Sequence, residues 1–195
     1  MSEKRGKLVV LSASSGAGKT TICKKLLKKN KDWKFSISVT TREKRENEKD
    51  GVDYNFVNKD KFEHLEKFGE LIESEWVHGN RYGTMIDPLE KALEDGEVML
   101  FDVDVKGAMN LIEEFEEDLV SFFIEPPGIN DQDKKENLLE RMHKRGNTNN
   151  TLINQRLKRY DLELSFKDKF NHSFINENID KTTSEVEKII KENIK

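Results

Sequence analysis

Hydrophobic residues fall into short runs, and between these runs apolar side chains recur every three or four positions. Some runs are apolar throughout, which is typical of parallel strands covered on both faces, and others alternate as half-buried strands do. The predicted strands are 8–11, 35–39, 52–57, 70–77, 98–101, 119–124 and 172–176. The polar residues 78–84, rich in turn-forming side chains, predict a tight turn.

The intervening segments have helical spacing and recognisable ends. They predict helices at 19–30, 59–68, 87–95, 105–115, 133–144, 152–166 and 186–194. Asp87 before Pro88 predicts a capped helix start, and Thr182 with Glu185 predicts a capping box for the last helix. Strands that alternate with helices favour an α/β fold with a doubly wound parallel sheet.

The segment 8–21, LVVLSASSGAGKTT, joins a buried strand to a helix through a glycine-rich loop. This context is what a phosphate-binding P-loop requires, because backbone N–H groups and the positive end of the helix dipole meet there. Lys19 is expected to reach the β- and γ-phosphates, and the Thr20 hydroxyl to help hold Mg²⁺. Ala13 replaces the first glycine of the motif, which a negative φ permits; an ordinary glycine-rich turn is the alternative. The nucleotide-binding candidates of this loop are Ser14, Ser15, Gly16, Ala17, Gly18, Lys19, Thr20 and Thr21.

Composition narrows the class of protein. A chain of 195 residues, 34% hydrophobic and 37% charged, predicts one compact domain. No apolar run is long enough to span a membrane, and the single cysteine, Cys23, indicates a reducing, cytoplasmic compartment. The net charge is −4, yet residues 1–49 carry 14 Lys/Arg against 5 Asp/Glu. That local excess suits a polyphosphate ligand, and no basic stripe suggests a nucleic-acid partner.

Two carboxylates follow the apolar run at 98–101. Asp102 and Asp104 therefore stand at the carboxyl end of a predicted central strand, where open α/β sheets bind ligands. Residues 104–107 also match the D-x-x-G pattern of GTPases. A guanine-reading N-K-x-D motif is missing, which argues against a GTPase.

Arginines form two groups beside polar segments. Arg42 and Arg45 flank Ser38, Thr40 and Thr41, and they predict a second anion site, because Arg holds phosphate oxygens bidentately. A solvated loop explains the same pattern equally well. A second group brackets a polar loop and predicts a lid that clamps phosphates, with a solvated helical hairpin as the alternative. Its members are Arg141, Arg145, Arg156 and Arg159.

Taken together, these motifs resemble the guanylate kinase family, the nucleoside monophosphate kinases that move a phosphoryl group from ATP to GMP. The similarity covers nearly the whole chain. The matching segments are SASSGAGKTT, FSISVTTREKR, GVDYNFV, ELIES, GNRYGT, LFDVDVKG, RMHKRG and INQRLKR. The resemblance implies a P-loop core at about 1–35, 85–135 and 160–195, a small α/β GMP-binding region at about 36–84, and a helical lid at about 136–158.

The resemblance also implies a role for each matching residue. The GMP phosphate would be held by Ser38, Arg42, Arg45, Tyr54 and Tyr82. The guanine would be read by Glu73, Thr84 and Asp104. The transferring phosphoryl group would be surrounded by Lys19, Arg141, Arg145 and Arg156. Asp102 would help organise Mg²⁺ through water, and Asn176 would lie near the adenine of ATP.

One stretch departs from the family pattern, and two alternative functions are left open. The stretch 128–135 is longer than the family usually has before its lid, which concerns the lid hinge and not its arginines. A guanylate-kinase-like module that binds phosphopeptides without catalysis is one alternative, and a kinase for another nucleoside monophosphate is the other. Lys19 and Thr20 argue against the non-catalytic module. A monomer acting on GMP and ATP is expected, with a dimer as the alternative.

Overall fold

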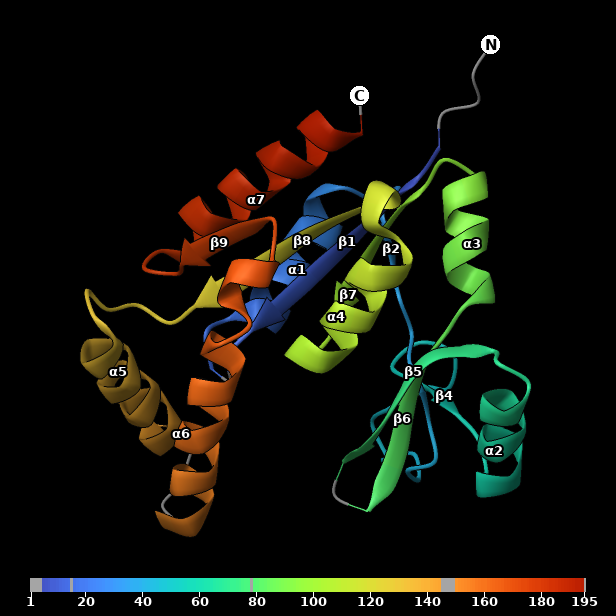
Figure 1. Cartoon of the computed structure of the whole chain (residues 1–195), viewed down its shortest axis with the longest axis horizontal. Coiled ribbons are helices and arrows are strands. Elements are labelled where there is room, and N and C mark those ends of the chain that lie inside the picture. Colours follow the sequence, from blue (N-terminus) through green and yellow to red (C-terminus); the bar gives the residue numbers. More distant parts are fainter. Residues whose placement is uncertain (1–4, 15, 78, 145–149, 195) are drawn as a thin grey trace.

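A five-stranded parallel sheet forms the centre of the protein, with strand order β2-β7-β1-β8-β9 (Figure 1). The computed structural model describes residues 5–14, 16–77, 79–144 and 150–194, without the side chains of 77, 141–144 and 150–156. The strands are β1 (Lys7–Ala13), β2 (Lys34–Phe35), β7 (Val98–Asp102), β8 (Leu119–Glu125) and β9 (His172–Ile175). This sheet confirms the predicted doubly wound fold.

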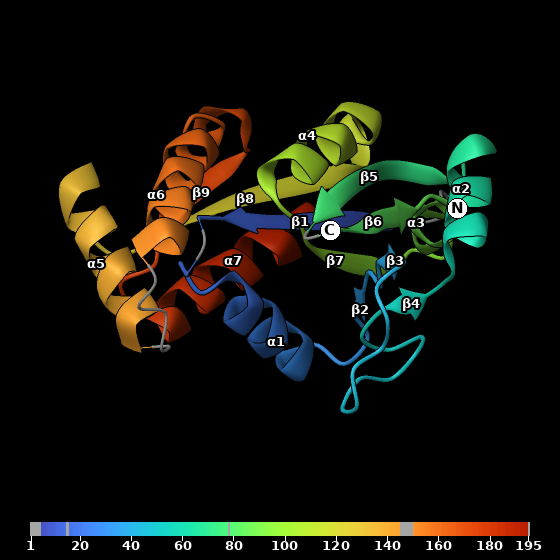
Figure 2. The same ribbon diagram turned by 90° about the horizontal axis from the view of Figure 1, so that it is seen from below.

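Helices cover both faces of this sheet (Figure 2). On one face lie α1 (Lys19–Lys29) and α7 (Ile179–Asn193), and on the other lie α3 (Asp87–Glu94) and α4 (Val105–Glu114). Along β1, Val9 and Leu11 pack in the cluster of α1 and α7, whereas Leu8 and Val10 pack in the cluster of α3 and α4. Successive side chains of a strand point to opposite faces, so a strand buried on both sides is apolar throughout.

A second, four-stranded sheet has the order β4-β3-β6-β5. Its strands are β3 (Val39–Thr40), β4 (Asn55–Phe56), β5 (Leu71–Val77) and β6 (Asn80–Met85), and α2 (Lys59–Lys67) packs against it through Phe62 and Leu65. The prediction of a tight turn at 78–84 was wrong, because most of this segment is β6, paired antiparallel with β5 and β3. Strand pairing on both sides overrides the turn-forming character of its glycine and asparagine.

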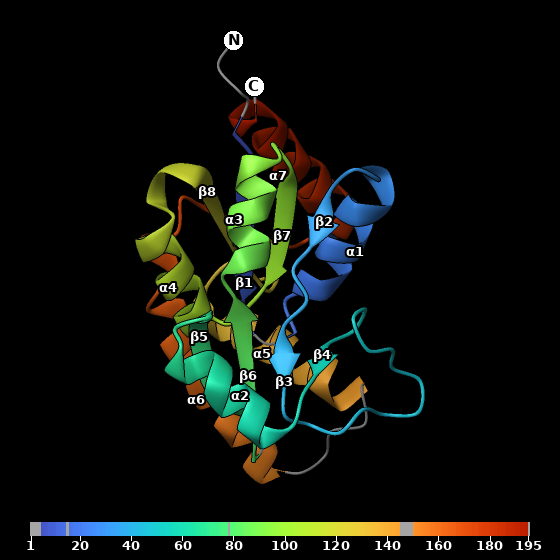
Figure 3. The ribbon, with the colours of Figure 1, turned by 90° about the vertical axis from the view of Figure 1, so that its right-hand side faces the viewer.

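Two helices, α5 (Asp131–Lys144) and α6 (Asn150–Leu164), leave the core together. Figure 3 shows that they and the second sheet both lie beyond the end of the central sheet where its strands stop. Leu138 and Tyr160 are fully buried between the two helices. The short 3₁₀ turns Glu116–Asp118 and Lys167–Lys169 complete the chain. No described helix is long and apolar enough to cross a membrane.

An ionic triad fixes the base of α5. The Glu125 carboxylate, at the end of β8, lies 2.6 Å from the Lys134 ammonium of α5 and 2.6 Å from that of Lys167. Glu125 and Lys134 are buried. The stretch 128–135 thus enters the first turn of α5 and brings Lys134 against the sheet.

Several element ends differ from the sequence prediction. The strands predicted at 35–39 and 52–57 are shorter in the structure, where the strands are Lys34–Phe35, Val39–Thr40 and Asn55–Phe56. Asp87 is the first residue of α3 and makes no cap bond. The cap of α7 is Asn178, whose side chain accepts the N–H groups of residues 180 and 181. The helix starts there because Ile179 packs on the core, which places Thr182 inside the helix.

Candidate functional site

The loop after β1 has the backbone of a P-loop. Gly16 and Gly18 have φ values of 91° and 104°, which only glycine adopts readily. The Ala17 N–H donates to the Ser14 carbonyl at 3.0 Å, and the Thr21 N–H, in the first turn of α1, donates to the Gly18 carbonyl at 3.0 Å. Ala13 lies in β1 opposite Ile124, an extended conformation in which alanine is unstrained. Because the loop runs directly into α1, its N–H groups and the helix N-terminus provide an anion site.

A lysine, a threonine and an aspartate meet beside this loop. The Lys19 ammonium lies 2.8 Å from Asp102 Oδ1 and donates to the Val103 carbonyl at 2.6 Å. The Thr20 hydroxyl donates to Asp102 Oδ2 at 2.8 Å. Parallel pairing of β1 and β7 sets Leu11 opposite Asp102, so the sheet register brings the carboxylate to the loop. A cation, a hydroxyl and a carboxylate therefore share the edge where phosphates would bind.

The same group fits a magnesium ion. Thr20 and Asp102 offer the hydroxyl and carboxylate oxygens that Mg²⁺ prefers. Among the described residues, no group of three or more His, Cys, Asp or Glu could hold a metal. Mg²⁺ usually keeps several waters and binds through one or two protein oxygens plus substrate phosphates, which agrees with such a sparse set.

Residues from two distant elements contact the loop. The Asn176 amide donates to the Ala17 carbonyl at 2.7 Å, while its buried Oδ1 has no partner among the described residues. A Cβ placed on Gly16 would lie 2.8 Å from Leu138 Cδ1, so α5 packs directly on the loop. The contact between Leu138 and the loop was not predicted from the sequence, because it joins elements far apart in the chain.

The second sheet and α4 form an acidic corner. The Thr84 hydroxyl donates to Glu73 Oε1 at 2.7 Å across the β5–β6 pair. Asp104 caps α4, and its Oδ1 accepts the N–H groups of Lys106 and Gly107. A Cβ on Gly107 would lie 3.6 Å from Asp104 Oδ1 and 3.7 Å from the Glu73 carboxyl carbon. Two carboxylates thus border one glycine, where a ligand with several N–H donors fits.

Electrostatics separate Glu73 from an ordinary surface acid. Burial raises the pKa of Glu73, and the negative charges of Asp104 and Glu75 raise it further, whereas the Thr84 hydrogen bond opposes both. A carboxylate that is costly to ionise gains most from a ligand that donates hydrogen bonds to it.

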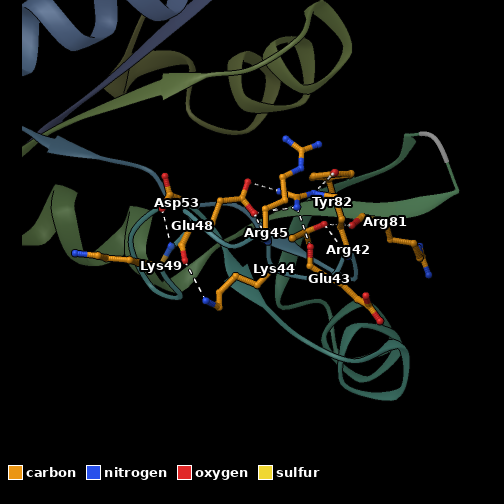
Figure 4. Close-up of polar contacts among 10 residues, drawn as sticks. Arg42, Glu43, Lys44, Arg45, Glu48, Lys49, Asp53, Arg81 and Tyr82 are labelled. Carbon is orange, nitrogen blue, oxygen red and sulfur yellow. Dashed lines mark hydrogen bonds and ion pairs between the residues drawn. The ribbon is translucent and has the colours of Figure 1, made fainter.

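Arg42 and two tyrosines lie together where the sequence predicts a second anion site (Figure 4 draws the polar contacts of Arg42 and Tyr82). The Arg42 Nε donates to the Tyr82 hydroxyl at 3.1 Å, and the guanidinium carbon lies 5.3 Å from the centre of the Tyr54 ring. The two tyrosine rings meet edge to face with centroids 5.7 Å apart. Ser38 is half-buried just before β3, and Arg45 is exposed in the loop that follows it.

The structure tests only part of the predicted site. It brings together Lys19, Thr20 and Asp102; Glu73, Thr84 and Asp104; and Arg42, Tyr54 and Tyr82. Ser15 and Arg145 lie outside the described residues, as do the side chains of Arg141 and Arg156. Glu48, which pairs with Arg42, was missed. Arg159 was predicted as one of the lid arginines, but its contact with Asp104 at 3.1 Å was not predicted. The Arg159–Glu163 spacing of four is readable in the sequence, but the partners in other elements are not.

The fold and the loop after β1 together define a P-loop nucleotide-binding protein. The family model of guanylate kinase matches residues 5–193. A guanylate kinase of Chlorobium chlorochromatii is 43% identical over 188 residues, 96% of either chain. One of Bradyrhizobium diazoefficiens is 40% identical over 97% of this chain and 84% of its own. The crystal structure of guanylate kinase from Anaplasma phagocytophilum superposes with a TM-score of 0.75 at 32% identity, covering 99% of this chain and 89% of that one. The chain belongs to the guanylate kinase family.

Proposed function

We propose that this protein phosphorylates GMP, and dGMP, to the diphosphate with ATP as the donor, in purine nucleotide metabolism. The observation that carries the proposal is the convergence of Glu73 and Asp104 on Gly107, at the sheet edge that also holds Lys19. Guanine presents an N1–H and a 2-amino group on one edge, both donors. Ionised carboxylates only accept, so the acidic corner complements that edge.

The phosphate of GMP would lie beside the arginine and the two tyrosines of the second sheet. Arg42, Tyr54 and Tyr82 already contact one another. Ser38 and Arg45 lie on either side of Arg42 in the chain. Guanidinium and hydroxyl groups donate hydrogen bonds to phosphate oxygens, and the transfer needs no general base. The phosphate is itself the nucleophile, so the residues only have to orient it and neutralise its charge.

ATP would occupy the P-loop. The loop N–H groups and Lys19 would hold the β- and γ-phosphates, and the unpartnered Asn176 Oδ1 offers an acceptor for the adenine amino group. Arg141, Arg145 and Arg156 of α5, the loop and α6 would surround the transferring phosphoryl group and exclude water. When bound, Mg²⁺ would neutralise phosphate charge, with Thr20 and, through water, Asp102 as its protein partners.

A coupled assay with ATP and each nucleoside monophosphate tests the proposal. With AMP bound, the lone pairs of Glu73 and Asp104 that the protein's own donors leave open would be buried without partners, which costs far more than a lost contact. Sites built to bind a substrate N–H reject analogues without it strongly, so we expect kcat/KM for GMP to exceed that for AMP by at least about 10³. Comparable turnover of AMP would overturn the guanine assignment. Phosphopeptide binding without any turnover would favour the non-catalytic module.

The proposal includes the setting of the enzyme. We propose a cytoplasmic monomer that acts on small molecules, with neither nucleic acid nor membrane as a partner. The single cysteine suits a reducing compartment, and Cys23 is buried in the core, where burial raises its pKa to about 12. Light scattering of the purified protein would distinguish the monomer from a dimer.

A further inference from the structure

Arg42 is held on almost every side. Its Nη2 and Nη1 bind Glu48 Oε1 and Oε2 at 2.7 and 2.9 Å, so the pair is bidentate. Nη1 also donates to the Glu43 carbonyl at 2.8 Å, and Nε donates to the Tyr82 hydroxyl (Figure 4). The side chains of Arg42 and Glu48 are only 14% and 16% exposed. This geometry differs from that of an ordinary surface ion pair, which is worth little.

The hydrogen-bond count limits what Arg42 can offer a ligand. A guanidinium has five N–H donors, and four of them are used, which leaves one on Nη2. The Tyr82 hydroxyl accepts the Nε hydrogen, so its own proton is free to be donated, since the described residues provide no acceptor for it. A phosphate beside Arg42 would therefore meet one guanidinium N–H and a tyrosine hydroxyl instead of a bidentate fork.

Glu48 also organises the loop that carries Arg45. Its Oε2 accepts the Arg45 N–H at 2.9 Å, and its carbonyl accepts the Lys44 ammonium at 3.1 Å. Figure 4 shows the Arg45 guanidinium extending away from the Arg42–Glu48 pair. The Arg42 hydrogen bonds, with that of the Arg45 N–H, lower the pKa of Glu48 to about 2, so the carboxylate is charged at neutral pH. The loop is thus folded around one anion.

We propose that Glu48 is a positioning residue of the phosphate subsite: it stays on Arg42 when the nucleotide phosphate binds, and so fixes Arg42, Tyr82 and Arg45. The proposal rests on the proposed function, because it takes the phosphate to be that of GMP. Arg42, Arg45 and Glu48 together carry a net charge of +1, and the phosphate that would bind them carries about −1.5 to −2. In the opposite arrangement, Glu48 would pair with the Arg42 guanidinium only in the free protein, and the phosphate would displace the Glu48 carboxylate on binding.

Kinetics of Glu48→Gln distinguish the two arrangements. If Glu48 positions Arg42, KM for GMP rises about tenfold, because a charge-assisted bidentate pair is lost. We expect kcat to change less and KM for ATP to stay within about twofold. A lower KM for GMP would show that Glu48 competes with phosphate and would overturn the proposal. An unchanged KM with a lower melting temperature would show a purely structural role and would also overturn it.

Control variants exclude a simple charge effect. Glu46 is exposed in the same loop, so Glu46→Gln changes the net charge equally and should leave KM within about twofold. Glu48→Asp keeps the charge and should give a KM between those of the wild type and the Gln variant. In an Arg42→Ala background, Glu48→Gln should cost clearly less than in the wild type, because the bidentate pair is already absent and only the contact with the Arg45 N–H remains. An equal cost in both backgrounds, or a KM of the Asp variant at or above that of the Gln variant, contradicts the proposal.

Calorimetric binding of GMP separates this inference from the proposed function. A wild type that binds GMP without phosphorylating it would refute the proposed activity, and the same variants compared by Kd would still decide the role of Glu48. A wild type that neither binds nor phosphorylates GMP would overturn both.

Discussion

Arg159 of α6 donates to Asp104 Oδ2, so α6 contacts the acidic corner in front of α4. Its Nε donates at the same time to the buried carboxylate of Glu163 at 2.9 Å. The other oxygen of Asp104 caps α4. The carboxylate proposed to read guanine is therefore oriented by two separate elements.

Arg159→Met should weaken GMP binding modestly. The Arg159 side chain is half exposed, and exposed ion pairs contribute about 0.2–1 kcal/mol, so we expect KM for GMP to rise by a factor of about 1.4 to 5 with KM for ATP unchanged. Lys158→Met changes an exposed charge at the neighbouring position and is the matched control. An equal rise of both KM values would instead indicate a general change in the lid.

The raised pKa of Glu73 gives a pH prediction. The acid form cannot accept from guanine at both oxygens, so KM for GMP should rise as the pH falls through that pKa, above the usual value of about 4.3. Native Glu73 binds its proton more tightly than the unfolded chain does. As the pH falls through that pKa, Glu73 therefore raises the free energy of unfolding. Because GMP itself titrates, the wild type is compared with Glu73→Gln at each pH. Parallel profiles would contradict the assignment.

Lys19→Ala should separate catalysis from stability. Losing a preorganised cation should lower kcat at least about 100-fold. Asp102 keeps the Thr20 hydroxyl as a donor, so we expect the melting temperature to change little. Lys25→Ala is the control, because Lys25 also lies in α1 and forms an ion pair, 2.7 Å from Asp180, but on an exposed surface. Near-normal turnover of the Lys19 variant would refute the kinase proposal.

Glu125→Gln should destabilise the protein by about 3–5 kcal/mol, because Lys134 would stay buried without its counter-charge. Burial raises the pKa of Glu125, but Lys134 and Lys167 outweigh it, so the pKa is lowered. Its stabilisation is complete above the unfolded pKa of about 4.3 and is lost as the pH falls further. The difference in melting temperature between wild type and variant should therefore narrow below about pH 4. Glu192→Gln, in an exposed pair, is the control.

Short sequence patterns predicted the features that depend on neighbouring residues, namely the P-loop and the central sheet. The P-loop followed from consecutive residues, and the sheet followed from strands that are apolar throughout. By contrast, β6 escaped prediction because its pairing with β5 and β3 overrides turn-forming residues. The pairing of Glu48 with Arg42 and that of Arg159 with Asp104 escaped prediction, because only the fold brings these partners close. Thr182 was predicted to cap the last helix, but Ile179 packs on the core, so the helix starts earlier and Asn178 caps it.

Glu125 also has a consequence for how the chain is connected. Lys134 stands near the start of α5 and Lys167 follows α6, so one carboxylate joins the two points where the chain leaves and re-enters the core. In polymer terms, the chain from Lys134 to Lys167 is a loop whose two ends are held together by Glu125. Each doubling of such a loop costs only about 0.6 kcal/mol in closure entropy. The register of the central sheet should therefore depend little on the length of the chain between Lys134 and Lys167.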